Sequence, residues 1–177
     1  MDEIVEAALR KWPNVPHCHG WLALDARGNW YLRDDASRAA GTFPQVKGGR
    51  IDNARLRAFI ERNYACDAHG GWYFQNGPQR VYVDLEAAPW VWRLHGAAAG
   101  TVPRVVSHTG RTATLHSVWT DDEGRLFLDT DIGLGLVHSL DMGLAADAVV
   151  SGHWVPATMP FADMAARFGH RLQPRPD

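Results

Sequence analysis

A short phrase that recurs three times constrains the fold of this sequence most strongly. Residues 25–28, 67–70 and 121–124 each read Asp-x-x-Gly, and a run of large apolar residues follows each glycine. The aspartate opens a tight turn by accepting a bond from nearby backbone, and the glycine supplies the positive φ that closes the turn. Each copy therefore predicts a β-hairpin. Three matched copies indicate duplication of a small unit, and their unequal spacing excludes a solenoid.

Apolar periodicity between these turns predicts the remaining elements. Helices are expected over 2–11, over 52–63 with Asp52 as N-cap, and over 160–168. Strands are expected over 80–84, 90–95, 102–107, 112–118, 125–129 and 134–140. The pattern indicates an α+β protein with two similar β-rich halves, built from antiparallel hairpins and a few short helices. We expect an N-terminal α+β subdomain over 1–87, a β-rich subdomain over 88–172, and a frayed tail over 173–177.

Composition narrows the class of protein. Apolar residues make up 46% of the 177-residue chain and charged residues 21%, which is typical of a globular fold. The formal net charge of −2 argues against general nucleic-acid binding. The longest apolar runs are far below the ~18 residues of a membrane span. The N-terminus lacks the pattern of a secretory signal, so a cytoplasmic location with Cys18 and Cys66 as free thiols is expected.

A basic segment is the first candidate site. Lys47-Gly-Gly-Arg50 leads into the expected helix, and helix N-termini suit anions. On a helical projection Arg55 and Arg62 border the apolar stripe, where their guanidinium groups would reach a ligand. The alternative is an ordinary solvated helix face.

A second candidate site combines forked or planar hydrogen-bonding groups with aromatic rings. Such groups can bind a flat polar ligand such as a nucleobase by edge bonds and stacking. We expect Arg62 and Arg80 to line one cleft between the halves, with an aromatic wall. The alternative is turn chemistry and structural arginines. The residues of this set are Arg62, Asn63, Tyr64, Gln75, Asn76 and Arg80.

Four residues raise the question of a metal site. His17, His19, Cys66 and His69 offer nitrogen and sulfur ligands of the kind that zinc prefers. Their spacing matches neither a paired Cys-x-x-Cys module nor His-Glu-x-x-His. The sequence therefore predicts no bound metal and no other cofactor.

Several phrases resemble an uncharacterised proteobacterial family, a domain of unknown function. They are Gly28-Asn-Trp30, Arg62-Asn-Tyr64, residues 67–76, Arg80-Val-Tyr-Val83 and Ala88-Pro-Trp90. The chain is also distantly similar to a second such family, which shows domain duplication and a C-terminal half similar to pleckstrin-homology folds. The resemblance implies a small open barrel or a pleckstrin-homology-like sheet in the C-terminal half. It implies no catalytic residue.

The function favoured by these patterns is a non-enzymatic ligand-binding or regulatory module. It would bind a small anionic or nucleotide-like ligand at the seam of the two halves, where ligands often lie. One alternative is a metal-dependent hydrolase that uses His17, His19, Cys66 and His69. Another is a module whose tryptophans bind a protein partner. No membrane association is expected.

Overall fold

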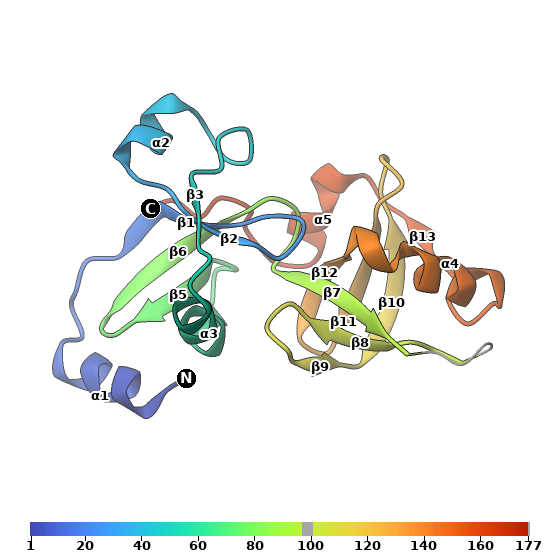
Figure 1. Cartoon of the computed structure of the whole chain (residues 1–177), viewed down its shortest axis with the longest axis horizontal. Coiled ribbons are helices and arrows are strands. Elements are labelled where there is room, and N and C mark those ends of the chain that lie inside the picture. The colour runs from blue at the N-terminus through green and yellow to red at the C-terminus, as the bar shows by residue number, and fades with distance from the viewer. Residues whose placement is uncertain (97–100, 177) are drawn as a thin grey trace. The chain divides into compact units, whose positions relative to one another are not determined.

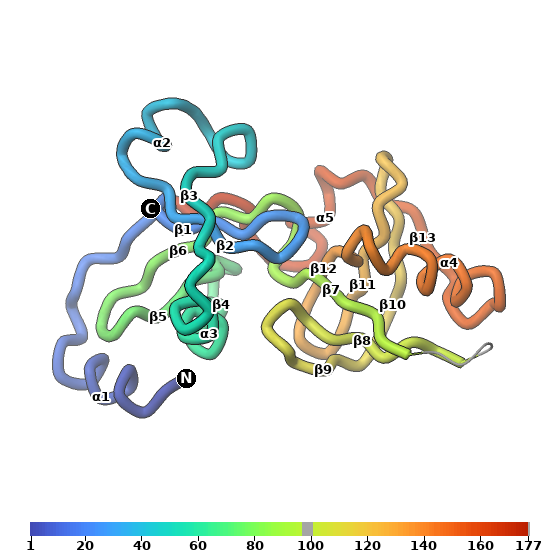
Figure 2. The backbone as a smooth tube through the Cα atoms, in the orientation of Figure 1, coloured from blue at the N-terminus to red at the C-terminus, as the bar shows by residue number. Residues whose placement is uncertain are grey.

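The computed structural model describes residues 1–96 and 101–176, and its chain forms two compact units (Figures 1 and 2). The first unit holds most of the chain up to Glu86 and also the C-terminal segment that starts at Gly169. The second unit holds Ala87–Phe168 and the turn Ala26–Gly28. The sequence-based division at residue 87 lies one residue from this one, but the C-terminal segment belongs to the first unit.

The first unit is built on a six-stranded sheet. Strands β1 and β6 are parallel, and every other neighbouring pair in this sheet is antiparallel. Its strands in spatial order are β3 (Gly49–Arg50), β2 (Trp30–Leu32), β1 (Cys18–Leu24), β6 (Gln79–Leu85), β5 (Trp72–Asn76) and β4 (Tyr64–Cys66).

The second unit is built on a seven-stranded sheet. Strands β7 and β12 are parallel, as are β10 and β13. Its strands in spatial order are β13 (Ala157–Thr158), β10 (Leu115–Thr120), β11 (Leu126–Thr130), β12 (Gly133–Val137), β7 (Trp90–His95), β8 (Arg104–Ser107) and β9 (Thr112–Ala113).

The two sheets repeat one topology. In each unit the first strand pairs in parallel with the sixth, the first three strands run outward on one side, and the last three form a meander on the other. Strands β1 to β6 thus correspond in order to β7 to β12, and β13 is an addition at one edge. The predicted α+β fold with two similar β-rich halves is confirmed.

The three Asp-x-x-Gly phrases form the same turn. Asp25, Asp67 and Asp121 each accept a hydrogen bond at Oδ1 from the backbone N–H four residues later, at 2.8–2.9 Å. The glycine of each phrase has a positive φ of 74–80°. The turns at Asp67 and Asp121 join corresponding strands, β4 to β5 and β10 to β11. The first turn joins β1 to β2, so only its local chemistry is shared.

A fourth turn of this kind has serine in place of aspartate. Ser107 Oγ accepts a bond from the backbone N–H of Arg111 at 3.1 Å, and Gly110 has a φ of 84°. This turn joins β8 to β9. A search for aspartate alone overlooks it because a hydroxyl oxygen can accept the same backbone bond.

Short helices complete both units. Three of them, α2, η1 and α4, are absent from the sequence-based prediction. No helix in residues 1–96 or 101–176 combines the length and apolar character needed to cross a bilayer. The helices are α1 (Glu3–Lys11), α2 (Asp35–Ala40), α3 (Ala54–Arg62), the 3₁₀ turn η1 (Ser139–Asp141), α4 (Met142–Val150) and α5 (Phe161–Arg167).

Helix α3 packs on one face of the first sheet and lies beside β5 (Figure 1). Its Phe59 contacts Phe74 of β5 edge to face at 5.4 Å, and Ile60 is fully buried. The N-cap is Asn53, whose Oδ1 accepts bonds from the N–H groups of Arg55 and Leu56. The prediction of Asp52 as N-cap is therefore wrong.

Candidate functional site

The side chains of strand β6 show which face of the first sheet is polar and which is apolar. Its sequence alternates polar and apolar side chains, which therefore point to opposite faces. Phe74, which α3 covers, pairs with Val81, so the helix lies on the apolar face. The opposite face carries the polar residues of β6, which are Arg80, Tyr82 and Asp84.

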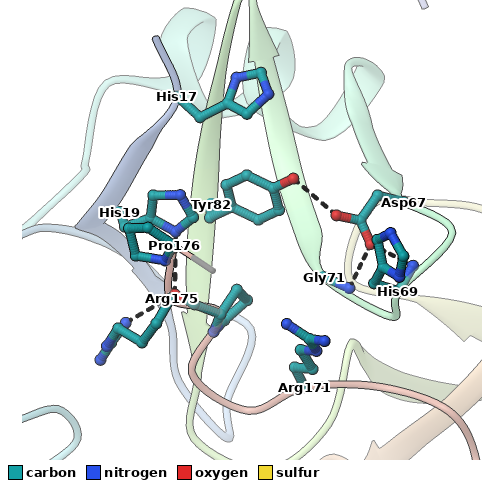
Figure 3. A pocket seen from close by; sticks show the side chains of 10 residues that line it. His17, His19, Asp67, His69, Gly71, Tyr82, Arg171, Arg175 and Pro176 are labelled. Carbon is teal, nitrogen blue, oxygen red and sulfur yellow. Dashed lines mark hydrogen bonds between the residues drawn. The ribbon is translucent and has the colours of Figure 1, made fainter.

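A hollow of about 350 Å³ opens on this polar face (Figure 3). We call it the histidine hollow. It draws its lining from β1, the β4–β5 turn, β6 and the C-terminal segment, all within the first unit. Its lining residues are His17, His19, Asp67, His69, Gly71, Tyr82, Arg171, Pro174, Arg175 and Pro176.

Tyr82 and Asp67 form a fixed wall of the hollow. The Tyr82 hydroxyl donates to Asp67 Oδ2 at 2.7 Å, while Asp67 Oδ1 accepts from the backbone of His69 and Gly71. Desolvation alone would raise the pKa of Asp67, but these hydrogen bonds outweigh it and lower the pKa. Desolvation and the bond to Asp67 raise the pKa of Tyr82. This wall thus consists of the Asp67 carboxylate, which is hydrogen-bonded within the protein, and the neutral phenol of Tyr82.

Two histidines stand beside Tyr82. The His19 ring stacks on the Tyr82 ring at 4.5 Å with an angle of 8° between the planes. His17 meets the same ring edge to face at 5.9 Å. Burial and then the nearby charge of Arg80 lower the pKa of His17, so its ring is neutral at pH 7. Arg80 itself stacks on Tyr73 at 4.6 Å, on the same face of the sheet.

The C-terminal segment supplies the cations of the hollow. The backbone N–H of Arg171 donates to the carbonyl of Gly70, and the Leu85 N–H donates to the carbonyl of Leu172. Figure 3 shows the Arg171 guanidinium directed into the hollow near Gly71. Arg175 Nη1 donates to Asp84 Oδ1 at 2.8 Å. The expected frayed tail is therefore wrong for residues 173–176, which dock on the sheet.

A second hollow of about 510 Å³ adjoins the first. We call it the arginine hollow. It extends over β1, α2 and the loop after α2, again within the first unit. Its lining residues are His17, His19, Gly20, Arg33, Arg38, Gly41, Thr42, Phe43, Arg175 and Pro176.

The two arginines expected to converge are separate. Arg62 Nε and Nη2 donate to the carboxylate of Asp2 at 3.2 Å, which ties α3 to the start of α1. Arg80 lies on the opposite face of the sheet from α3, because its neighbour Tyr73 alternates with Phe74. The predicted convergence of Arg62 and Arg80 is wrong, since the sheet stands between them.

The predicted partners of Arg62 have structural contacts. Asn63 is buried, accepts the Asp2 backbone N–H and donates to the Phe59 carbonyl. Tyr64 is buried against Trp30 and Trp72. These contacts place both residues on the α3 side of the first unit and leave their binding role a prediction.

Gln75 and Asn76 belong to the β5–β6 hairpin. Gln75 is buried, and its amide donates to the Gly77 carbonyl at 2.9 Å. Asn76 pairs with Gln79 and is exposed at the turn. Neither residue lines the two hollows.

Lys47 and Arg50 of the basic segment before α3 are paired with carboxylates. Lys47 Nζ lies 3.0 Å from Glu86 and 3.3 Å from Asp25, and Arg50 pairs with Asp52 at 3.2 Å. The first N–H groups of α3 are occupied by Asn53. Arg55 is exposed on the helix and lines neither hollow. Carboxylates inside and outside the segment thus hold Lys47 and Arg50, and the role of Lys47 and Arg55 in ligand binding stays a prediction.

The histidines of the metal alternative come together only in part. His17, His19 and His69 line the histidine hollow, whereas Cys66 is exposed outside its lining. In the part of the chain that the structure describes, no group of three or more His, Cys, Asp or Glu side chains could hold a metal ion. Desolvation and then the Asp67 charge raise the pKa of the Cys66 thiol to about 11, which leaves it protonated.

Comparison with known proteins places the chain in a family. Residues 1–175 match the model of DUF2944, which is described as a protein of unknown function (DUF2946). The chain belongs to the DUF2944 family. The match spans both units and confirms the resemblance to an uncharacterised family. No curated protein matches the chain.

Two solved structures are similar to this DUF2944 protein. A DUF1285 family protein from Silicibacter pomeroyi DSS-3 has a TM-score of 0.51 and 14% sequence identity, over 83% of this chain and 84% of that one. A DUF1285 family protein from Shewanella baltica OS155 has a TM-score of 0.44 and 17% identity, over 74% and 94% of the chains. The first likeness shows a shared fold.

Sequence reasoning missed most of the lining of the hollows. The alternation of Arg80, Tyr82 and Asp84 along β6 is visible in the sequence and marks a polar face. The return of Arg171 and Arg175 to that face has no local signal, because they lie about ninety residues further along the chain. Of the residues predicted to bind a ligand, Arg80 and its cross-strand pair Gln75 lie on the polar face, and neither lines the two hollows.

Proposed function

We propose that the first unit binds a small organic anion in the histidine hollow. The observation that carries this proposal is the charge of the lining. Two arginines and three histidines surround a space in which one described residue, Asp67, is acidic. Asp67 already accepts bonds from Tyr82, His69 and Gly71, so the positive charge of the lining comes from the guanidinium groups of Arg171 and Arg175, the second of which also pairs with Asp84.

The size and walls of the hollow favour a small molecule. A volume of about 350 Å³ lies within the range of small-molecule sites. The His19–Tyr82 stack and two prolines supply flat apolar surface beside the cations. An organic anion with a planar part, such as a nucleotide, uses both features.

The proposed site lies within the first unit, whereas the sequence-based expectation put it at the seam of the two halves. Every lining residue of the histidine hollow belongs to that unit, and the sequence-based choice of Arg62 loses its support because Asp2 holds that side chain. Binding without chemistry accounts for the lining more simply than hydrolysis. The Asp67 carboxylate is fully engaged, and the protonated Cys66 thiol lies outside the lining.

The experiment is titration calorimetry of the full chain with AMP and with inorganic phosphate. We expect AMP to bind and Arg171→Ala to weaken its binding about tenfold or more, since an arginine–phosphate pair contributes roughly 1.5–3 kcal/mol. Arg62→Ala removes the same charge from the opposite face of the sheet and is the matched control. It should leave AMP affinity within about twofold.

Two results would contradict the proposal. One is the absence of heat for either anion at millimolar concentration. The other is equal weakening by Arg171→Ala and Arg62→Ala, which would mean that the ligand responds to net charge and not to the hollow.

A further inference from the structure

The two hollows are compartments of one groove. They share four lining residues, His17, His19, Arg175 and Pro176. Figure 3 shows His19, Arg175 and Pro176 on one side of the histidine hollow, with Asp67 and His69 on the other. The arginine hollow therefore begins where the histidine hollow ends. A ligand seated in one compartment reaches the other past these shared residues.

The floor of the arginine hollow has an excess of positive charge. Arg33 is buried, with 4% of its surface exposed, and donates through Nη2 to the Gly41 carbonyl at 2.6 Å. Its nearest carboxylate is Asp84, 3.6 Å away, and Asp84 also pairs with Arg175 at 2.8 Å. One buried carboxylate thus serves two guanidinium groups. An uncompensated buried charge is costly unless a further anion joins it.

One donor on this floor has no protein partner. Among residues 1–96 and 101–176, nothing accepts a hydrogen bond from Arg33 Nε, and nothing donates one to the neighbouring Asp84 Oδ2. Buried N–H groups are nearly always satisfied by protein, water or ligand. Because Arg33 lines the arginine hollow, a water or a ligand held beside it would supply the acceptor that Nε lacks.

A third arginine stands at the rim. The Arg38 guanidinium lies 5.1 Å from the Trp21 ring centroid, and its partner Asp35 is exposed at 3.3 Å. Ion pairs between exposed groups are weak, so Arg38 can exchange Asp35 for a ligand at little cost. The stacked ring holds the guanidinium in place while leaving its N–H donors available.

We propose that the ligand carries two phosphate groups, one in each hollow, joined by a flat organic part that passes the shared residues. This inference rests on the proposed function, because it extends the same groove. Forked guanidinium groups bind phosphate through two parallel hydrogen bonds, which favours phosphate as the anionic group. The ligand class is an organic bisphosphate of the size of a nucleoside bisphosphate.

The test compares AMP with adenosine 3′,5′-bisphosphate by titration calorimetry on the full chain. We expect the bisphosphate to bind at least about tenfold more tightly than AMP, because it makes one additional charge-assisted contact. Arg38→Ala should abolish this advantage while leaving AMP affinity within about twofold, because AMP occupies the histidine hollow. Arg55→Ala, an exposed arginine on α3, removes the same charge and should preserve the advantage. Circular dichroism checks that each variant is folded.

The outcomes separate the two proposals. If AMP binds but the bisphosphate binds no more tightly, or if Arg38→Ala weakens both probes equally, the second phosphate site is wrong and the anion site stands. If Arg38→Ala weakens the binding of 1,3-propanedicarboxylate as much as it weakens the binding of the bisphosphate, the groove binds dianions in general and the choice of phosphate is wrong. If neither nucleotide binds, both proposals fail.

Discussion

At the scale of single residues, His170 combines burial with a lack of partners. Its side chain is buried, and neither ring nitrogen has a hydrogen-bond partner within the described parts of the chain. Burial lowers its pKa from 6.5 to about 4. Between these two values the unfolded chain binds more protons than the folded one, so the free energy of unfolding falls as the pH falls from 6.5 towards 4.

We expect His170→Leu to flatten this pH dependence. The substitution removes one proton-linked group, which contributes up to ~1.4 kcal/mol per pH unit within that window. At pH 7.5 the variant should be as stable as the parent or slightly more stable, since no hydrogen bond is lost. Urea denaturation at pH 7.5, 6 and 5 measures both quantities. Some slope should remain because burial also lowers the pKa of His108, to about 3. Parallel stability curves for parent and variant would contradict this account.

Gly135 is required by the packing of two buried tryptophans. It pairs with Trp90 across β12 and β7, and a Cβ atom at this position would lie 2.7 Å from the Trp90 Cβ and would collide with the Trp92 indole nitrogen. Both rings are fully buried, so neither can move aside.

We therefore expect Gly135→Ala to lower the free energy of unfolding by ~2 kcal/mol or more. The matched control is Gly143→Ala in α4, where the same methyl group meets open space. That change should be neutral or stabilise by up to ~1 kcal/mol, since alanine is the better helix former. Equal thermal midpoints for the two variants would show that the tryptophan packing is not as described.

At the scale of elements, the C-terminal segment is a structural part of the first unit. Gln173 donates to the Phe43 carbonyl, His19 and the Pro174 carbonyl oxygen are 3.2 Å apart, and Arg175 pairs with the buried Asp84. The segment closes the polar face as α3 closes the apolar one.

Deleting residues 173–177 should therefore destabilise the protein by ~2 kcal/mol or more. The deletion removes the hydrogen bonds of the Gln173 side chain, the Pro174 carbonyl and the Arg175 side chain. It also leaves the buried Asp84 carboxylate with Arg33, 3.6 Å away, as its ion-pair partner. Urea unfolding of the parent and the shortened chain gives the difference. A frayed tail, as the sequence alone suggested, would make the deletion neutral within ~0.5 kcal/mol.

The elements differ in how well the sequence predicts them. The Asp-x-x-Gly turns were predictable because the aspartate oxygen and the glycine φ act within five residues. Helix α3 was predictable from its apolar stripe, although the cap at Asn53 was misplaced by one residue. Helix α4 was not, since Met142–Val150 is apolar on every side apart from Asp147 and shows no helical period.

At the scale of the whole molecule, the repeated topology followed from local signals and the candidate site did not. Matched turns and alternating strands already indicated two similar halves. The site depends on which face of a sheet each side chain occupies and on a segment that returns from Gly169. Arg62 and Arg80 illustrate the difference. They are eighteen residues apart in the sequence, yet a sheet separates them.

The most direct test of the anion site is an NMR titration of the full 19.6 kDa chain with AMP, followed by amide chemical shifts. We predict that the largest, saturating shift changes cluster on the lining of the histidine hollow, including the amides of Gly71, Tyr82 and Arg171. Amides around Arg62 and Asp2, on the other face of the sheet, should move little. Shift changes that are absent at millimolar AMP, or that lie in the second unit alone, would contradict the account.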